Sequence, residues 1–249
     1  MGSFAGGLVG SQAETARYLN ATQAMIHTII GAKLFHPVFQ PVVALDDGSI
    51  VGYEALTRFE DGQGPDEHFA IATSVDMGVE LEVACARAAV HDATRLPSDS
   101  WLSLNFSPTV AAGEQAHEII VGANRTVAIE ITEHARIDNF DEIRRAVASV
   151  SGCQLFVDDA GAGYAGLHHI LELRPDVVKL DISLVRDIDH DPARQALVSG
   201  MRHFADLTGT RLLGEGIETA AEAETLRSLG VDLGQGYFFG RPARVEDLR

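Results

Sequence analysis

The sequence has few cysteines, few basic residues and no long apolar run, and each shortage excludes a class of protein. Two cysteines, Cys85 and Cys153, cannot build a disulfide scaffold, so a reducing, cytoplasmic setting is expected. Lysine and arginine total 19 against 36 aspartates and glutamates, and the resulting net charge of −17 opposes binding to nucleic acid. No apolar run approaches the roughly 20 residues that a membrane helix needs, so no membrane insertion is expected.

The first 33 residues differ in pattern from the rest of the chain. Residues 1–10 lack the basic start and apolar stretch of a signal peptide and are predicted to be a flexible leader. Residues 14–30 have the apolar spacing of a helix, which is interpreted as a linker from an upstream sensory domain. We therefore predict a leader and N-terminal helix over residues 1–33 and one large domain over residues 34–249.

Short apolar segments alternate with segments of helical period along the large domain. Residues 38–45 and 50–59 flank an Asp-Asp-Gly-Ser turn and are predicted to form an antiparallel hairpin. Further strands are predicted over residues 101–106, 127–131, 154–157, 177–180, 211–213 and 231–239. Helices are predicted over residues 65–77, 79–96, 107–112, 140–150, 165–173, 192–207 and 219–229. This alternation predicts an α/β fold, a (β/α)8 or TIM barrel. A doubly wound open sheet is the alternative, but the Gly-x-Gly-x-x-Gly motif of dinucleotide folds is absent after any early strand.

Polar residues stand where the predicted strands end. They are Glu54, Asn105, Glu130, Asp158, Asp159, Lys179, Asp181, Glu215, Glu218 and Gln235. In barrels of this kind the carboxyl ends of the strands carry the active site. One acidic residue at a strand end is more often a helix cap or a surface residue, but a set in register predicts a shared pocket. Oxygen ligands suit Mg²⁺, Mn²⁺ or Ca²⁺, and a pair of such ions about 4 Å apart can cleave phosphate esters.

At these positions the sequence resembles the EAL-domain family of cyclic di-GMP phosphodiesterases. The signature tripeptide is Glu54-Ala55-Leu56, and the match extends over residues 34–243 with other motifs in the family's order. They are FQPVV at 39–43, LSLNFSP at 102–108, IEITE at 129–133, DDAGAGY at 158–164, KLD at 179–181, EGIET at 215–219 and QGY at 235–237.

The resemblance implies a modified TIM barrel with one antiparallel strand, which hydrolyses cyclic di-GMP to linear pGpG with two Mg²⁺ or Mn²⁺ ions. Calcium is expected to inhibit, because it holds a different coordination geometry. The implied metal ligands are Glu54, Asn105, Glu130, Asp158, Asp159 and Glu215. The implied catalytic residues are Lys179, Glu215 and Glu218, and the implied substrate-binding residues are Gln40, Leu56, Arg58 and Gln235. Glu133 and Asp181 are implied to support the loop after Asp159 and the site around it.

One loop departs from the family pattern, which is usually Asp-Phe-Gly-Thr-Gly. Here Ala160 replaces the aromatic residue and Ala162 the hydroxyl residue. In the family this loop couples dimerisation to metal binding, so the change bears on the regulation of an expected homodimer and on its rate. An EAL-type receptor that binds cyclic di-GMP or a partner protein without hydrolysis is the alternative function. The two are distinguished by the metal ligands, and their presence together with Lys179 favours the enzyme. For single residues, a surface ion pair of Arg58 and an ordinary strand-end Lys179 are the other interpretations. An unrelated metal-dependent barrel, such as an enolase-like enzyme, is the third interpretation.

Overall fold

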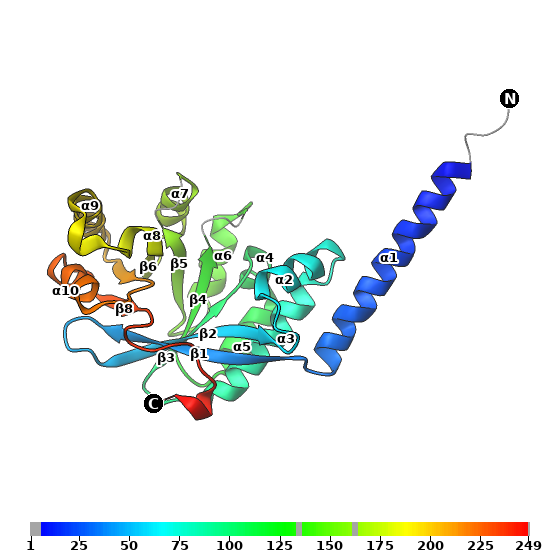
Figure 1. Cartoon of the computed structure of the whole chain (residues 1–249), viewed down its shortest axis with the longest axis horizontal. Helices are drawn as coiled ribbons and strands as arrows, with labels where there is room; N and C mark the ends of the chain where they lie inside the picture. Colours follow the sequence, from blue (N-terminus) through cyan, green and yellow to red (C-terminus); the bar gives the residue numbers. More distant parts are fainter. Residues whose placement is uncertain (1–5, 133–135, 161–163, 249) are drawn as a thin grey trace. The chain divides into compact units, whose positions relative to one another are not determined.

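The computed structural model describes residues 6–132, 136–160 and 164–248, and within these the side chains of residues 14–132, 136–158 and 167–248. Eight strands close into a barrel in the order β1 to β8 (Figure 1). Their bounds are β1 Phe35–Ala44, β2 Ile50–Phe59, β3 Trp101–Asn105, β4 Val127–Thr132, β5 Gln154–Ala160, β6 Val177–Leu180, β7 Arg211–Gly214 and β8 Leu233–Gln235. The predicted barrel is confirmed, and the open sheet is wrong because β8 also pairs with β1.

Strand β1 runs in the opposite direction to the other seven strands. It pairs with β8 in antiparallel register, with Val42 opposite Gln235, whereas β2 to β8 pair in parallel. The turn to β2 is closed by hydrogen bonds from Gly48 N to Ala44 O and from Ala44 N to Ser49 O, both 2.9 Å. Gly48 has a φ of 74°, which glycine adopts without steric cost. The predicted hairpin is therefore confirmed.

Helix α1 precedes the first strand, and the other helices lie between the parallel strands. Their bounds are α1 Gly6–Gly31, α2 Pro65–Ser74, α3 Gly78–Ala93, α4 Pro108–Ala111, α5 Glu114–Gly122, α6 Phe140–Ala148, α7 Tyr164–Leu173, α8 Ile182–Val185, α9 Pro192–Thr208 and α10 Ala220–Ser228. Helices α5 and α8 were not predicted; α8 is a single turn that begins where Asp181 accepts a hydrogen bond from Ser183 N. No helix among the described residues combines the length and apolarity needed to cross a membrane.

The chain divides into two compact units. One consists of residues 1–37 and 57–88, and its described core packs Ile26 and Ile29 of α1 with Ala72 of α2 and Leu81 of α3. The other consists of residues 38–56 and 89–249. Helix α1 includes the predicted helix over residues 14–30 and begins earlier, at Gly6. The predicted domain boundary after residue 33 stays a prediction.

An apolar layer fills part of the barrel interior in the second unit. Its buried members are Val42, Trp101, Ala128, Phe156, Val177, Leu213 and Leu233. The rings of Trp101 and Phe156 meet edge to face, with centroids 5.2 Å apart. Gly52 of β2 leaves room for this indole, because a Cβ there would lie 2.1 Å from Trp101 Cδ2. This layer positions the polar side chains described next.

Because Gly52 packs against Trp101, we expect Gly52→Ala to destabilise the barrel by about 1–3 kcal/mol. The added methyl group forces the rigid, buried indole of Trp101 to move. Urea unfolding followed by circular dichroism measures the change. Gly200→Ala is the control: Gly200 lies in the middle of α9, and a Cβ added there would meet nothing within 4 Å, so the same substitution is expected to stabilise by up to about 1 kcal/mol. Equal midpoints for the two variants would contradict the tight packing at Gly52.

Candidate functional site

Polar side chains form a second layer, next to the apolar one and toward the carboxyl ends of the parallel strands. In four strands a polar residue follows the apolar-layer residue by two positions, and side chains two apart face the same side of a strand. These pairs are Ala128 with Glu130, Phe156 with Asp158, Val177 with Lys179, and Leu233 with Gln235. Because β1 runs in the opposite direction, Gln40 precedes Val42 yet reaches the same end of the barrel. Glu54 in β2, Asn105 at the end of β3 and Glu215 directly after β7 complete the layer.

Lys179 lies at the centre of four carboxylates, which together with it we name the carboxylate cluster. Its Nζ is 2.8 Å from Glu130 Oε2, 2.8 Å from Glu215 Oε1 and 3.2 Å from Asp158 Oδ1. Glu54 Oε2 is 3.7 Å from the same nitrogen. The side chains of Lys179 and Glu130 are 1% exposed, whereas those of Asp158 and Glu215 are 13% and 19% exposed. The cluster is therefore reached from solvent on the side of Asp158 and Glu215.

Three amide side chains orient Glu54 within the cluster. Asn105 Nδ2 donates to Glu54 Oε1 at 2.9 Å, and Gln235 Nε2 donates to Glu54 Oε2 at 2.7 Å. Gln235 Nε2 also donates to Gln40 Oε1 at 3.1 Å, and Gln40 Nε2 donates to Gly240 O at 3.1 Å. The buried Gln235 Oε1 has no hydrogen-bond partner among the described residues. This acceptor is available to a donor from water or a ligand.

Burial and charge act in opposite directions on the groups of the cluster. Burial alone would lower the pKa of Lys179, but the surrounding carboxylates raise that pKa well above its usual value, so the ammonium stays charged. Burial raises the pKa of Glu130 from 4.5 to about 8, although Lys179 opposes the change. Burial also raises the pKa of Glu215 well above its usual value, and the neighbouring carboxylates add to the effect. The cluster thus has one positive charge, that of Lys179, for four carboxyl groups.

The donor set of the cluster fits divalent cations. Four carboxylates and one ammonium leave a formal charge of −3. Burial is the main cause of the raised pKa values of Glu130 and Glu215, and the neighbouring carboxylates add to it. Asn105 adds a neutral oxygen, so all the donors are the hard ligands that Mg²⁺ and Mn²⁺ prefer. Within the described residues, no three acidic, histidine or cysteine side chains are already spaced as a metal site. Lys179 Nζ instead lies between the carboxylates.

The other residues predicted for the site have different surroundings. Glu218 forms a two-fold ion pair with Arg186 at 2.6 Å, and no described contact joins it to Lys179. Asp181 caps α8. Leu56 is half-buried near the end of β2, and Arg58, in the first unit, donates from Nη1 to Thr57 O at 2.9 Å. Glu133 lies outside the described residues, as does the side chain of Asp159. Their predicted roles stay predictions.

Two buried polar residues near the cluster were missed by sequence reasoning. Ser103 is fully buried beside Glu54 in the strand register, and its Oγ has no partner among the described residues. Glu222, on α10, is 2% exposed and caps the helix together with Thr219. The Thr-x-x-Glu spacing before an apolar helix is a capping-box pattern that could have indicated Glu222. Nothing in the sequence around Ser103 signals its unpaired hydroxyl.

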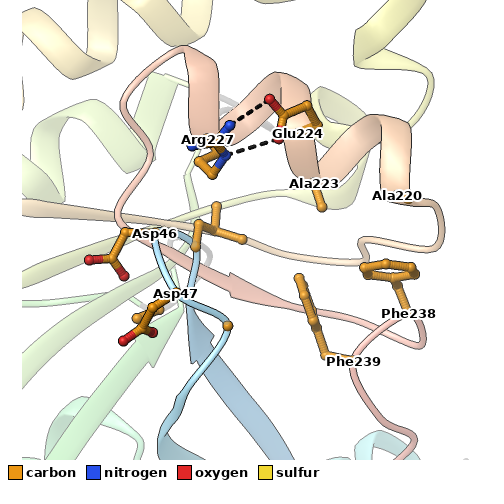
Figure 2. A pocket seen from close by; sticks show the side chains of 11 residues that line it. Asp46, Asp47, Ala220, Ala223, Glu224, Arg227, Phe238 and Phe239 are labelled. Atoms are coloured by element: carbon orange, nitrogen blue, oxygen red, sulfur yellow. Dashed lines mark hydrogen bonds and ion pairs between the residues drawn. The ribbon is translucent and has the colours of Figure 1, made fainter.

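A pocket of about 310 Å³ lies apart from the cluster, between the β1–β2 turn, α10 and the segment after β8 (Figure 2). Phe238 and Phe239 form one side, Asp46 and Asp47 another, and Arg227 pairs with Glu224 at 2.6 Å above them. None of its lining residues belongs to the cluster, so this pocket is separate from the candidate site.

Comparison with protein families identifies an EAL domain over residues 22–242. A relative named probable cyclic di-GMP phosphodiesterase PdeB, from Escherichia coli K12, is 26% identical over 84% of this chain and 43% of its own length. The cyclic di-GMP phosphodiesterase PdeR of the same strain is 30% identical over 78% of this chain and 32% of its own length. The chain therefore spans less than half the length of these relatives.

A solved structure shares both the fold and part of the sequence. BlrP1 of Klebsiella pneumoniae, in a complex with manganese and cyclic di-GMP, superposes with a TM-score of 0.75 at 30% identity. The match covers 84% of this chain and 56% of that one. The same protein has been solved with calcium and cyclic di-GMP. In these structural relatives the fold accommodates divalent metal together with a cyclic dinucleotide.

The raised pKa of Glu130 predicts how stability depends on pH when metal is removed. With a folded pKa of about 8 against 4.5 unfolded, the folded protein holds this proton more tightly, so stability falls as pH rises from 6 to 8. Glu215 acts in the same direction, with a limit of about 1.4 kcal/mol per pH unit for each proton. Urea unfolding in EDTA measures this slope. Glu130→Gln should flatten it, and an equal slope in both proteins would refute the assignment.

Proposed function

The chain belongs to the EAL-domain family, and from that premise we propose that it is a metal-dependent phosphodiesterase that hydrolyses cyclic di-GMP to linear pGpG. The observation that carries the proposal is the carboxylate cluster, in which Lys179 and four carboxylates meet at the carboxyl ends of the strands. The names of the relatives support the same substrate, and the titles of the structures support divalent metal.

The proposed metal ligands are the oxygens of the cluster and its neighbours. They are Glu54, Asn105, Glu130, Asp158, Asp159 and Glu215. Two bound Mg²⁺ or Mn²⁺ ions would supply an acidified water and charge stabilisation for the oxygens on phosphorus. The chain's own part is to hold these ligands rigid, and the amide network from Gly240 to Asn105 does this for Glu54. Because Glu130 and Lys179 are buried, bulk water is excluded from their side of the carboxylate cluster.

Lys179 and Glu215 are the proposed groups that act on the attacking water. The ammonium of Lys179 stays charged and donates toward the water oxygen. Glu215, partly exposed and 2.8 Å from Lys179, accepts the proton that the water loses. The water oxygen then bonds to phosphorus, the bond to the 3′ oxygen breaks, and that oxygen takes up a proton. The product is linear pGpG.

Substrate contacts are proposed for four residues. Arg58 presents a guanidinium that can pair with a phosphate through two parallel hydrogen bonds. Gln40 and Leu56 would line the side of a guanine base. Gln235 Oε1, which has no hydrogen-bond partner among the described residues, would accept from a water or base donor. Glu218, held by Arg186, keeps the loop after Glu215 in place. The second candidate function, a receptor that binds without hydrolysis, is favoured by the alanines at 160 and 162.

Glu54→Gln is expected to lower hydrolysis of cyclic di-GMP at least about 100-fold in Mn²⁺, because a charged ligand of the cluster becomes a neutral amide. Chromatography of pGpG over time measures the rate. Glu114→Gln, at the exposed start of α5, is the matched control and should keep the wild-type rate. A Glu54→Gln rate within a few-fold of wild type would reject the role. Binding without product in the wild-type protein would favour the receptor.

Metal binding should also be visible without substrate. Because divalent ions neutralise the cluster in the folded state alone, added Mn²⁺ or Mg²⁺ is expected to raise the unfolding temperature, and EDTA to reverse the increase. Calcium is expected to stabilise without supporting hydrolysis. Differential scanning calorimetry measures the shift, and Asp158→Asn should reduce it. Full hydrolysis in excess EDTA, or an unfolding temperature indifferent to metal, would contradict the proposal.

A further inference from the structure

Glu222 carries a buried carboxylate that binds backbone from two separate loops. Its Oε2 accepts from Glu218 N at 2.9 Å and from Thr219 N at 3.0 Å, in the loop between β7 and α10. Its Oε1 accepts from Asp187 N at 3.1 Å, in the turn after α8 and 35 residues away. Three backbone donors therefore converge on one side chain that is 2% exposed.

These contacts suit an ionised carboxylate. Although burial acts to raise the pKa of Glu222, the backbone donors at Glu218, Asp187 and Thr219 outweigh it and lower that pKa. The carboxylate also lies in the first turn of α10, where the helix dipole favours negative charge. A glutamine would place an NH₂ group against at least one of the three N–H donors. The site therefore fits a carboxylate better than an amide of the same shape.

The two loops are joined a second time by side chains. Arg186, directly before Asp187, forms the two-fold ion pair with Glu218. These four residues form a closed set of contacts, which we name the Glu222 ring. The Glu222 carboxylate accepts from Asp187 N and from Glu218 N. Arg186, the neighbour of Asp187, pairs with the side chain of Glu218. The turn itself is fixed from α9, because Arg194 donates to Arg186 O and Gln195 donates to Ile188 O.

The ring is connected to the carboxylate cluster through a short and rigid piece of chain. Glu215 N donates to Leu180 O at 3.2 Å, and Ile217 N donates to Gln235 O at 3.0 Å. Between them Gly216 has a φ of 64°, and a Cβ there would lie 2.4 Å from Ile182 Cγ1. Glu215 and Glu218 therefore cannot move independently, because the backbone that joins the ring to the residue beside Lys179 is short and fixed.

We propose that Glu222 is a positioning residue for the hydrolysis, because its carboxylate locks the loop after β7 to the turn after α8 and so holds Glu215 against Lys179. The inference rests on the proposed function for its kinetic part. It goes beyond helix capping, since a capping box needs the bond to Thr219 N but not the bond to Asp187 N. A misplacement of a reacting group by about 1 Å can cost about 100-fold in rate.

Glu222→Gln in the full chain tests the proposal. It is expected to lower kcat for cyclic di-GMP in Mn²⁺ about tenfold or more, with KM within about threefold, because substrate contacts stay in place while Glu215 moves. Thr219→Ala is the control for capping: it removes the hydroxyl that accepts from Glu222 N, lowers stability, and leaves the bond to Asp187. Glu224→Gln, exposed on the same helix, is the control for charge.

Hydrogen exchange provides a readout that does not need activity. In Glu222→Gln, peptides covering residues 183–190 and 215–221 should exchange faster than in wild type, whereas Thr219→Ala should leave 183–190 unchanged. Unchanged exchange at 183–190 would overturn the ring, whether or not the wild-type protein hydrolyses cyclic di-GMP. Equal loss of kcat in Glu222→Gln and in Thr219→Ala would overturn the positioning role. A wild-type protein without activity would reject the proposed function, and the exchange data would still decide on the ring.

Discussion

A buried ammonium held among carboxylates determines how the interior of this barrel is built. An unpaired charge at the depth of Lys179 would cost roughly several kcal/mol, so its position requires acidic partners. These partners come from β2, β4, β5 and the residue after β7, so one side chain of β6 is bonded to four other segments of the barrel wall. The apolar layer around Phe156 excludes water from one side of the carboxylate cluster, and this strengthens each ion pair of Lys179.

The period of two along a strand explains why so much of this site is visible in the sequence. In β4, β5, β6 and β8 an apolar side chain lies in the layer and the residue two positions later belongs to the polar layer, as Phe156 and Asp158 illustrate. The polar residues at the strand ends therefore outline the site in the sequence itself. The same rule, applied in reverse along an antiparallel strand, places Gln40 beside Gln235. Strand positions were predictable because burial fixes the register.

Contacts across long loops were not predictable, and the reason is physical. Glu218 follows Glu215 by three residues, but an ion pair with Arg186 determines where its side chain lies. The hydrogen bond from Asp187 N to Glu222 joins residues on different βα units. Neither hydrophobic periodicity nor helix and strand propensity indicates contacts between residues so far apart in the sequence. Helix α5 was missed although Ala116, Ile119 and Ile120 have helical spacing, because one glycine directly precedes this helix of nine residues and another ends it. Local pattern predicted elements and strand ends, whereas loop geometry depended on tertiary contacts.

Metal binding at the cluster would reconcile an acidic protein with the anionic substrate that we propose. A net charge of −17 repels a molecule with two phosphates, and the −3 of the cluster adds to this at short range. In the proposed enzyme, two divalent cations would bring the same set of groups to +1. Without metal, the raised pKa values of Glu130 and Glu215 show that the cluster takes up protons instead. Metal ions and protons therefore compete for the same carboxylates. The cluster attracts phosphate only when metal ions, and not protons, are bound to these carboxylates.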